Sequence, residues 1–115
     1  MKIMNRVQFM VLPHDVLFSE YEPCVFGPLK IKHQTTEYND FVEQQIADAI
    51  DAVDGGEMCD KLDDSQALGT SVAMDFNCAG RNCLYEPADR LYAVWERADL
   101  EQLVAKLQEV LSDMP

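Results

Sequence analysis

The sequence has few basic residues and no long hydrophobic run. Its 115 residues include 9 lysines and arginines against 21 aspartates and glutamates, so the formal net charge is −12. A charge of this sign disfavours direct binding to nucleic acid, whose phosphates are also anionic. The apolar run near the N-terminus, residues 9–12, ends at Pro13, whereas a membrane-spanning helix needs about 20 apolar residues. The sequence therefore predicts neither direct nucleic-acid binding nor a membrane anchor.

Signals for secretion and for familiar catalytic chemistry are also missing. The start, Met1 to Ile3, lacks the apolar region and cleavage site of a signal peptide, so we expect a cytosolic protein with mostly reduced cysteines. There is no Ser-His-Asp order, no His-Glu-x-x-His motif and no glycine-rich phosphate loop. Residues 54–57, Asp-Gly-Gly-Glu, are acidic where a phosphate site needs positive charge. We therefore expect a non-enzymatic protein without a cofactor or resident metal.

The apolar content is nevertheless that of a folded protein. Hydrophobic residues make up 48% of the chain and aromatic residues 9%, which separates it from disordered acidic chains. No Gly/Ser-rich or proline-rich linker divides the sequence. We expect a single compact domain over residues 1–115.

Hydrophobic periodicity predicts the order β-β-α-β-β-α. Such an order favours an α+β fold, a two-layer sandwich with a mixed or mostly antiparallel sheet and both helices on one face. The predicted strands cover 5–12, 24–32, 70–76 and 91–96. The first predicted helix runs from an N-cap at Thr35 or Thr36 to Gly55-Gly56, with its apolar stripe over 42–53, and the second covers 100–111. A turn is predicted at 14–23 and a polar connection at 57–68. In the first helix, an apolar stripe at helical spacing ends before Gly55-Gly56, which predicts a glycine C-cap there.

Acidic residues are concentrated between Glu37 and Asp64. This segment contains ten acids and one base, Lys61, for a net charge of −9, so the remainder of the chain carries only −3. The acids that we expect to form a partner-binding surface are Asp40, Glu43, Asp48, Asp51, Asp54, Glu57, Asp60, Asp63 and Asp64.

Two interpretations of this segment compete. A charged helix face is often only a solvated surface, but such faces usually mix signs because Glu–Lys pairs stabilise helices. The predicted helix has no cation, and its acids reach Asp51 and Asp54 in the last turn, where the helix dipole disfavours them. We therefore predict that residues 40–64 bind a basic protein surface, such as the nucleic-acid site of a nuclease, and inhibit that protein by competition.

Proteins with this task include immunity proteins against toxic nucleases and anti-CRISPR proteins of phages. The chain is similar to them in size and charge, and it carries no motif of either group. Calcium binding is disfavoured, because neither Gly55 nor Gly56 can occupy the glycine position of an EF-hand loop with acids at the required positions. Like charges repel, so we expect a monomer, or a weak homodimer that does not use the acidic face.

Cysteine spacing supports an alternative function. Cys78 and Cys83 lie close enough in sequence to share a zinc ion or to form a redox pair, with Cys24 and Cys59 as further candidate ligands. A metal- or thiol-dependent small protein centred on Cys78 and Cys83 is therefore the second hypothesis. An accessory subunit of a larger complex, with an acidic face that serves only solubility, is the third.

Overall fold

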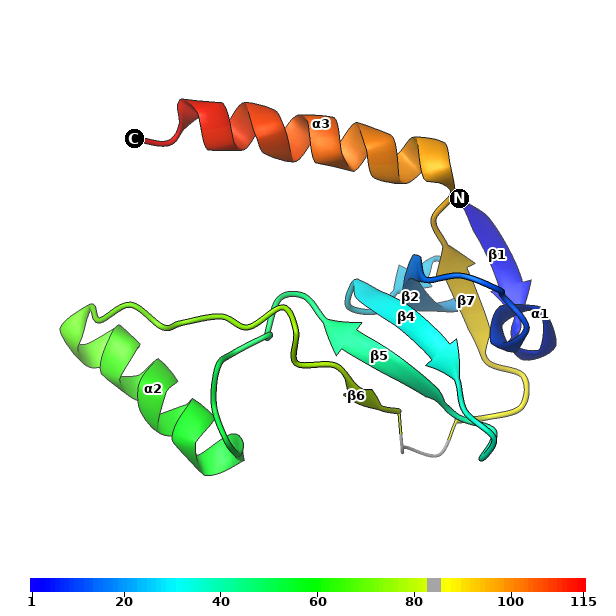
Figure 1. The fold of residues 1–115 in the computed structure, drawn as a ribbon, viewed down its shortest axis with the longest axis horizontal. Coiled ribbons are helices and arrows are strands. Elements are labelled where there is room, and N and C mark those ends of the chain that lie inside the picture. Colours follow the sequence, from blue (N-terminus) through cyan, green and yellow to red (C-terminus); the bar gives the residue numbers. More distant parts are fainter. Residues whose placement is uncertain (83–85) are drawn as a thin grey trace.

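The computed structural model describes residues 1–82 and 86–115, which form seven strands and three helices (Figure 1). In chain order the elements are β1 (Lys2–Asn5), α1 (Arg6–Met10), β2 (Val16–Glu22), β3 (Val25–Phe26), β4 (Lys30–Thr35), β5 (Phe41–Gln45), α2 (Gly55–Leu68), β6 (Gly80–Arg81), β7 (Leu91–Val94) and α3 (Arg97–Asp113).

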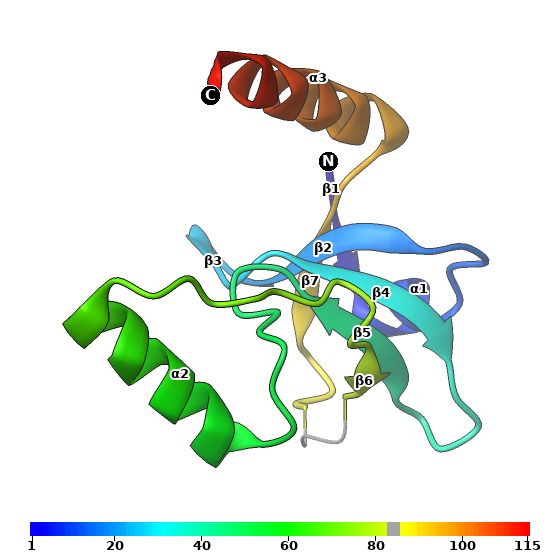
Figure 2. The same ribbon diagram turned by 60° about the vertical axis from the view of Figure 1, so that its left-hand side comes forward.

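The strands form one antiparallel sheet in the order β1-β7-β2-β4-β5-β6, and β3 pairs with the end of β2 (Figure 2). Strand β2 lies at the centre, where Phe18 is opposite Val94 of β7 on one side and Lys30 of β4 on the other. The predicted class, α+β with a mostly antiparallel sheet, is confirmed, and the predicted order and layering agree with the structure roughly.

The core is built around Phe9, which α1 places on one face of the sheet. Its ring stacks on that of Tyr92 with 3.9 Å between centroids, and the rings of Phe18 and Phe41 lie 4.8 Å and 5.2 Å away. Such clusters add to the free energy of burial because aromatic pairs attract one another through their quadrupoles. The buried cluster consists of Phe9, Val16, Phe18, Phe41, Tyr92 and Val94.

Helix α1 replaces the predicted strand 5–12, which was wrong beyond residue 5. Asn5 caps the helix: its side chain accepts a hydrogen bond from the backbone of Gln8, whose side chain bonds back to the backbone of Asn5. This capping box ends β1 and starts a helix. The alternation of Val7, Phe9 and Val11 suggested a strand, but only Phe9 is buried.

The next strand also differs from the prediction. Residues 14–23 were expected to be a turn, yet 16–22 form the central strand β2, whose first four residues are buried. The predicted strand 24–32 exists only in part, because β3 and β4 are separated by the residues around Gly27 and Pro28.

The helix predicted between Thr36 and Gly55 is wrong. Its first part is strand β5, in which Phe41 and Gln44 are each 1% exposed, and the following residues are not helical. Pairing with β4 on one side and β6 on the other overrides the helical spacing of the apolar residues. The helix instead forms at 55–68, the predicted polar connection, and Gly55 and Gly56 begin it rather than end it.

Later predictions are mostly confirmed. The strand predicted at 91–96 is β7, and the helix predicted at 100–111 is the centre of α3. The predicted strand 70–76 is reduced to a single bridge between Met74 and Ile50.

The molecule is less compact than a typical domain of this length. Its radius of gyration is 16.3 Å, against about 13 Å for a compact chain of roughly 100 residues. Figure 1 shows the reason, because α2 and α3 both project away from the sheet. Neither of these two helices, both described in full, has a buried side chain.

We predict that Phe9→Ala destabilises the protein by about 3–5 kcal/mol, the usual effect of deleting a large buried aromatic ring. Chemical denaturation of the two proteins measures the difference. Val7→Ala is the control on the same helix: Val7 is 75% exposed, so its effect should stay within about 0.5 kcal/mol. Equal effects of the two substitutions would contradict the role given to Phe9.

Candidate protein-binding site

The nine acids predicted to bind a partner fall into two groups. Glu43 lies in β5 and Asp40 directly precedes it; their side chains are 13% and 14% exposed and paired with cations. The other seven lie between Asp48 and Asp64, outside the sheet. The structure therefore brings together only part of the predicted surface.

Asp40 is engaged by its neighbours. The hydroxyl of Thr36 and the guanidinium of Arg81 donate to its carboxylate, with Arg81 Nη2 at 2.7 Å and Nε at 2.9 Å. The hydrogen bond from Thr36, and then those from Arg81, lower the pKa of Asp40. This carboxylate links the start of β5 to Arg81 of β6, so its charge is already compensated within the protein.

Glu43 faces Lys30 on the neighbouring strand. Lys30 Nζ lies 3.5 Å from the Glu43 carboxylate and 3.8 Å from that of Glu20. Burial raises the pKa of Glu43, and Lys30 partly opposes this. Both carboxylates therefore share one half-buried cation inside the protein.

The remaining seven acids lie on an insertion between β5 and β6, residues 46–79, which we call the arm. The arm leaves and rejoins the sheet at the same edge (Figure 2). Its two ends are held together near the Ile50–Met74 bridge, where the amide of Asp51 donates to Ala73 O at 2.9 Å and that of Asp75 to Ala49 O at 2.8 Å. Six of the seven acids are exposed: Asp48, Asp51, Asp54, Asp60, Asp63 and Asp64.

Asp54 determines where helix α2 begins. Its carboxylate accepts a hydrogen bond from the backbone of Glu57 at 2.8 Å, so it satisfies one of the free amides of the first turn. Gly69, in the left-handed conformation with φ of 74°, ends the helix. An acid followed three residues later by Glu is a capping signal, and Asp54 with Glu57 is the pattern that sequence reasoning missed.

This placement overturns one argument for the acidic face. Asp51 and Asp54 were expected in the last turn of a helix, where the dipole disfavours them. They precede α2, and Asp54 and Glu57 lie at its N-terminus, where the dipole favours negative charge. The acids at this end of the arm therefore stabilise the helix locally.

Within α2, the acids gather on one side. Glu57, Asp60 and Asp64 follow at intervals of three and four residues, and so share a helical face. Lys61 is the only cation of α2: its Nζ lies 2.8 Å from the Glu57 carboxylate and 2.6 Å from Asp51 O. These contacts fix α2 against the start of the arm.

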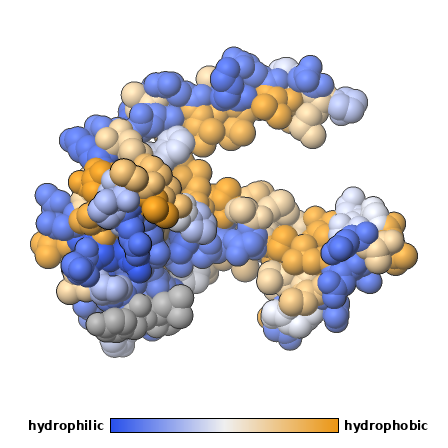
Figure 3. All heavy atoms as spheres, turned by 180° about the vertical axis from the view of Figure 1, so that it is seen from behind, coloured by the Kyte–Doolittle hydropathy of each residue, from blue (hydrophilic) through white to orange (hydrophobic). Residues whose placement is uncertain are grey.

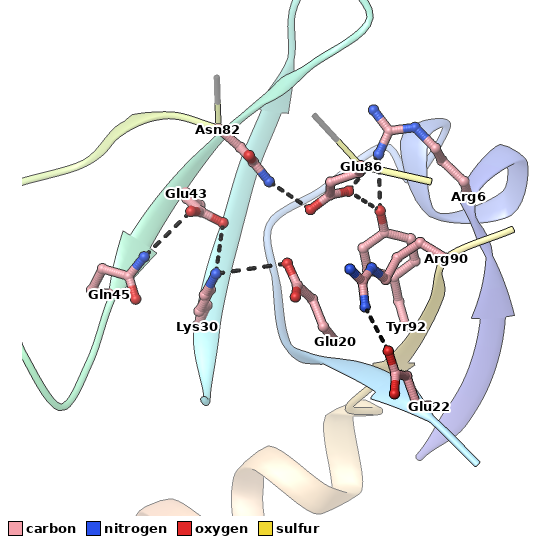
Figure 4. A network of polar contacts seen from close by, with 10 residues as sticks. All are labelled: Arg6, Glu20, Glu22, Lys30, Glu43, Gln45, Asn82, Glu86, Arg90 and Tyr92. Atoms are coloured by element: carbon pink, nitrogen blue, oxygen red, sulfur yellow. Dashed lines mark hydrogen bonds and ion pairs between the residues drawn. The ribbon is translucent and has the colours of Figure 1, made fainter. Parts of the chain in front are cut away.

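A second polar cluster, which the sequence did not reveal, occupies the sheet face beside the aromatic core (Figure 4). Arg6 Nη1 donates to Glu86 at 2.7 Å and to the hydroxyl of Tyr92 at 2.9 Å, and Asn82 donates to Glu86 at 2.9 Å. The Tyr92 hydroxyl also donates to Glu86. Glu86 therefore ties the chain that follows the undescribed residues to the sheet.

The pKa values of two neighbouring carboxyl groups in this cluster shift in opposite directions. Burial, and then a hydrogen bond to Glu86, raise the pKa of Glu20. Burial alone would also raise the pKa of Glu86, but hydrogen bonds from Tyr92, Asn82 and Glu20 outweigh it and lower the value. Burial and the bond to Glu86 raise the pKa of Tyr92. Because each of these groups is bonded within the chain, we interpret the cluster as a structural element.

The structure describes three of the four cysteines on which the zinc or redox hypothesis depends. Cys24, Cys59 and Cys78 are exposed free thiols, while Cys83 lies outside the described residues. Within 1–82 and 86–115 no three His, Cys, Asp or Glu side chains are grouped to hold a metal ion. A site that includes Cys83 stays a prediction.

Comparisons of the chain with protein-family models, with curated proteins and with solved structures found no match. Among the described residues, no helix has both the length and the hydrophobicity to cross a bilayer.

We predict that Asp54→Ala loosens α2 selectively, because it removes the N-cap, at a cost of about 1 kcal/mol to the helix. Hydrogen exchange should quicken for the amides of 57–68 and stay unchanged in β2 and β7. Asp48→Ala is the matched control, because it removes the same charge from an exposed residue that does not cap a helix. Identical exchange of α2 in the two variants would refute the capping role.

We predict that Tyr92→Phe destabilises the protein by about 1–2 kcal/mol at neutral pH, because Glu86 and Arg6 lose a buried hydrogen-bond partner. The lowered pKa of Glu86 adds stability above its ordinary value of 4.5, and this stability is lost as the pH falls through the folded value. The variant should lose less stability upon acidification.

Denaturant unfolding at a series of pH values tests this. Tyr38→Phe is the control, because the Tyr38 side chain is 68% exposed and its variant should keep the wild-type pH profile. A Tyr92→Phe profile parallel to the wild type would argue against the coupling of Tyr92 to Glu86.

Proposed function

We propose that the protein is a small, non-enzymatic, cytosolic inhibitor that inserts its acidic arm into the basic site of a nucleic-acid-handling protein. A nuclease or a nucleic-acid-guided complex offers such a site. Competition for the phosphate-binding groove is the mechanism.

The observation that carries this proposal is the concentration of exposed carboxylates on the arm. Residues 48–64 contain seven acids and one lysine, a net charge of −6, and all but Glu57 among these acids are exposed. Asp40 and Glu43, which are paired inside the sheet, drop out of the proposed surface. The surface is thus narrower than residues 40–64.

The shape of the arm also supports docking into a groove. Helix α2 has no buried side chain along its described length, and it stands clear of the sheet in both ribbon views (Figures 1 and 2). Carboxylates one turn apart are separated by about 5.4 Å along the axis, so α2 presents a row of negative charges. A Lys/Arg-lined groove would be attracted to this row at long range, and salt would weaken the attraction.

We predict that reversing three exposed arm acids, Asp51, Asp60 and Asp63, to Lys abolishes binding to the target. Asp54 is spared, because its loss would disturb α2 itself. The measurement is binding of the purified chain to a panel of nucleases and nucleic-acid-guided effectors from the same host. Binding should weaken as salt rises, and single-stranded DNA should compete for the target.

The control variant reverses Glu37, Asp89 and Glu101, three exposed acids outside the arm. Both triple variants have the same net charge of −6, so a difference between them reports the position of the charge. If both lose binding equally, only net charge matters and the arm is not the binding site. If neither loses it, the competitive mechanism is wrong.

A further inference from the structure

Helix α3 carries an apolar stripe that nothing in the described chain covers. Its side chains recur at intervals of three and four residues along four turns, the spacing of a helix that packs on another helix. The view from behind shows this stripe along the underside of the helix, facing the open space beside the sheet (Figure 3). The exposed fractions are 43% for Leu100, 45% for Val104, 55% for Leu107, 53% for Val110 and 70% for Leu111.

The stripe continues into one cleft at the base of α3, and a second cleft lies along the flank of the helix. The cleft on the flank has a volume of 560 Å³ and is lined by Trp95, Leu103, Asp99 and Lys106, among others. In the single chain, Asp99 is paired with the amino group of Met1 and Lys106 with Glu109. The cleft at the base, of 450 Å³, also reaches Trp95 and is lined by Leu17, Ile31 and Leu100, among others. The exposed Val110 and Leu111 lie at the C-terminal end of α3, whereas Trp95, which lines both clefts, lies at its N-terminal end.

We propose that α3 pairs in antiparallel orientation with α3 of a second copy of this chain. Antiparallel pairing places the free end of each helix at the base of the other, so each apolar end reaches a cleft. Such a contact is isologous and closes as a two-fold dimer. The proposal makes no use of the acidic arm, so it is independent of the proposed function.

Charge on one flank of the stripe supports a second copy as the occupant. Asp99, Lys106 and Asp113 follow at seven-residue intervals, so the sign alternates along this flank. Antiparallel helices bring the same flank of the two copies together. Aligning Lys106 with Asp99 of the second copy creates two equivalent ion pairs by symmetry.

The same alignment fits the apolar groups. It places Val110 and Leu111 of each helix opposite Trp95 of the other, at the mouth of both clefts. The ion pairs and the apolar contacts therefore require one and the same register. In this register residues 97–108 of the two helices face each other over about 18 Å, and the last turn of each α3 extends over the base of the other.

Sedimentation velocity of the full chain over a series of micromolar concentrations tests the proposal. The mass should rise from 13.1 kDa to twice that value as the concentration increases. Leu107→Asp, in the middle of the stripe, should remain at the monomer mass throughout. Gln108→Asp adds the same charge at the next position, off the stripe, and should dimerise like the wild type.

Charge-reversal variants test the proposed alignment of Lys106 with Asp99 of the second copy. Lys106→Glu should weaken dimerisation at least tenfold, whereas Arg97→Glu, on the other flank, makes the same charge change and should alter it less than threefold. Circular dichroism checks that each variant is folded. A wild-type mass of one chain at every concentration would overturn the proposal and leave the face to a different protein. Equal behaviour of Leu107→Asp and Gln108→Asp would overturn it as well.

Discussion

The contact between Phe9 and the sheet is the interaction on which the rest of the fold depends. Helix α1 has only five residues, too few to be stable alone, and Phe9 anchors it by stacking on Tyr92. The contact is reciprocal, because α1 covers the aromatic part of the sheet face. Lys32, fully buried beside Phe9 and Phe41, shows how closed this region is: its Nζ retains a single described hydrogen bond, to His33 O.

Carboxylates are compensated differently beside the aromatic cluster and on the arm. Beside the aromatic cluster, carboxylates such as Glu20 and Glu86 are half-buried, and cations, hydroxyls and amides from several elements compensate them. On the arm, the acids are solvated and Lys61 is the only base near them. The first arrangement holds several elements of the fold together, while the second leaves its charges exposed to solvent.

The sequence predicted the fold class, β7 and α3, because their patterns are local and strong. It failed where long-range pairing decides: residues 42–53 have helical spacing, but β4 and β6 recruit the first of them into a strand. The sequence shows that acids are concentrated at 37–64, but it does not show that the structure divides them between the sheet and the arm. Glu43 is half-buried because it pairs with Lys30 of the neighbouring strand β4. A local sequence pattern cannot predict such a contact between strands. The capping signal of Asp54 was readable and was missed.

The arm leaves β5 and returns at β6, two strands that pair with each other. An excursion of this kind adds little entropic cost as it grows, since each doubling of loop length costs only about 0.6 kcal/mol. The sheet closes through its own hydrogen bonds whatever the excursion contains. The arm can therefore be lengthened, shortened or replaced without changing the pairing of the strands that carry it.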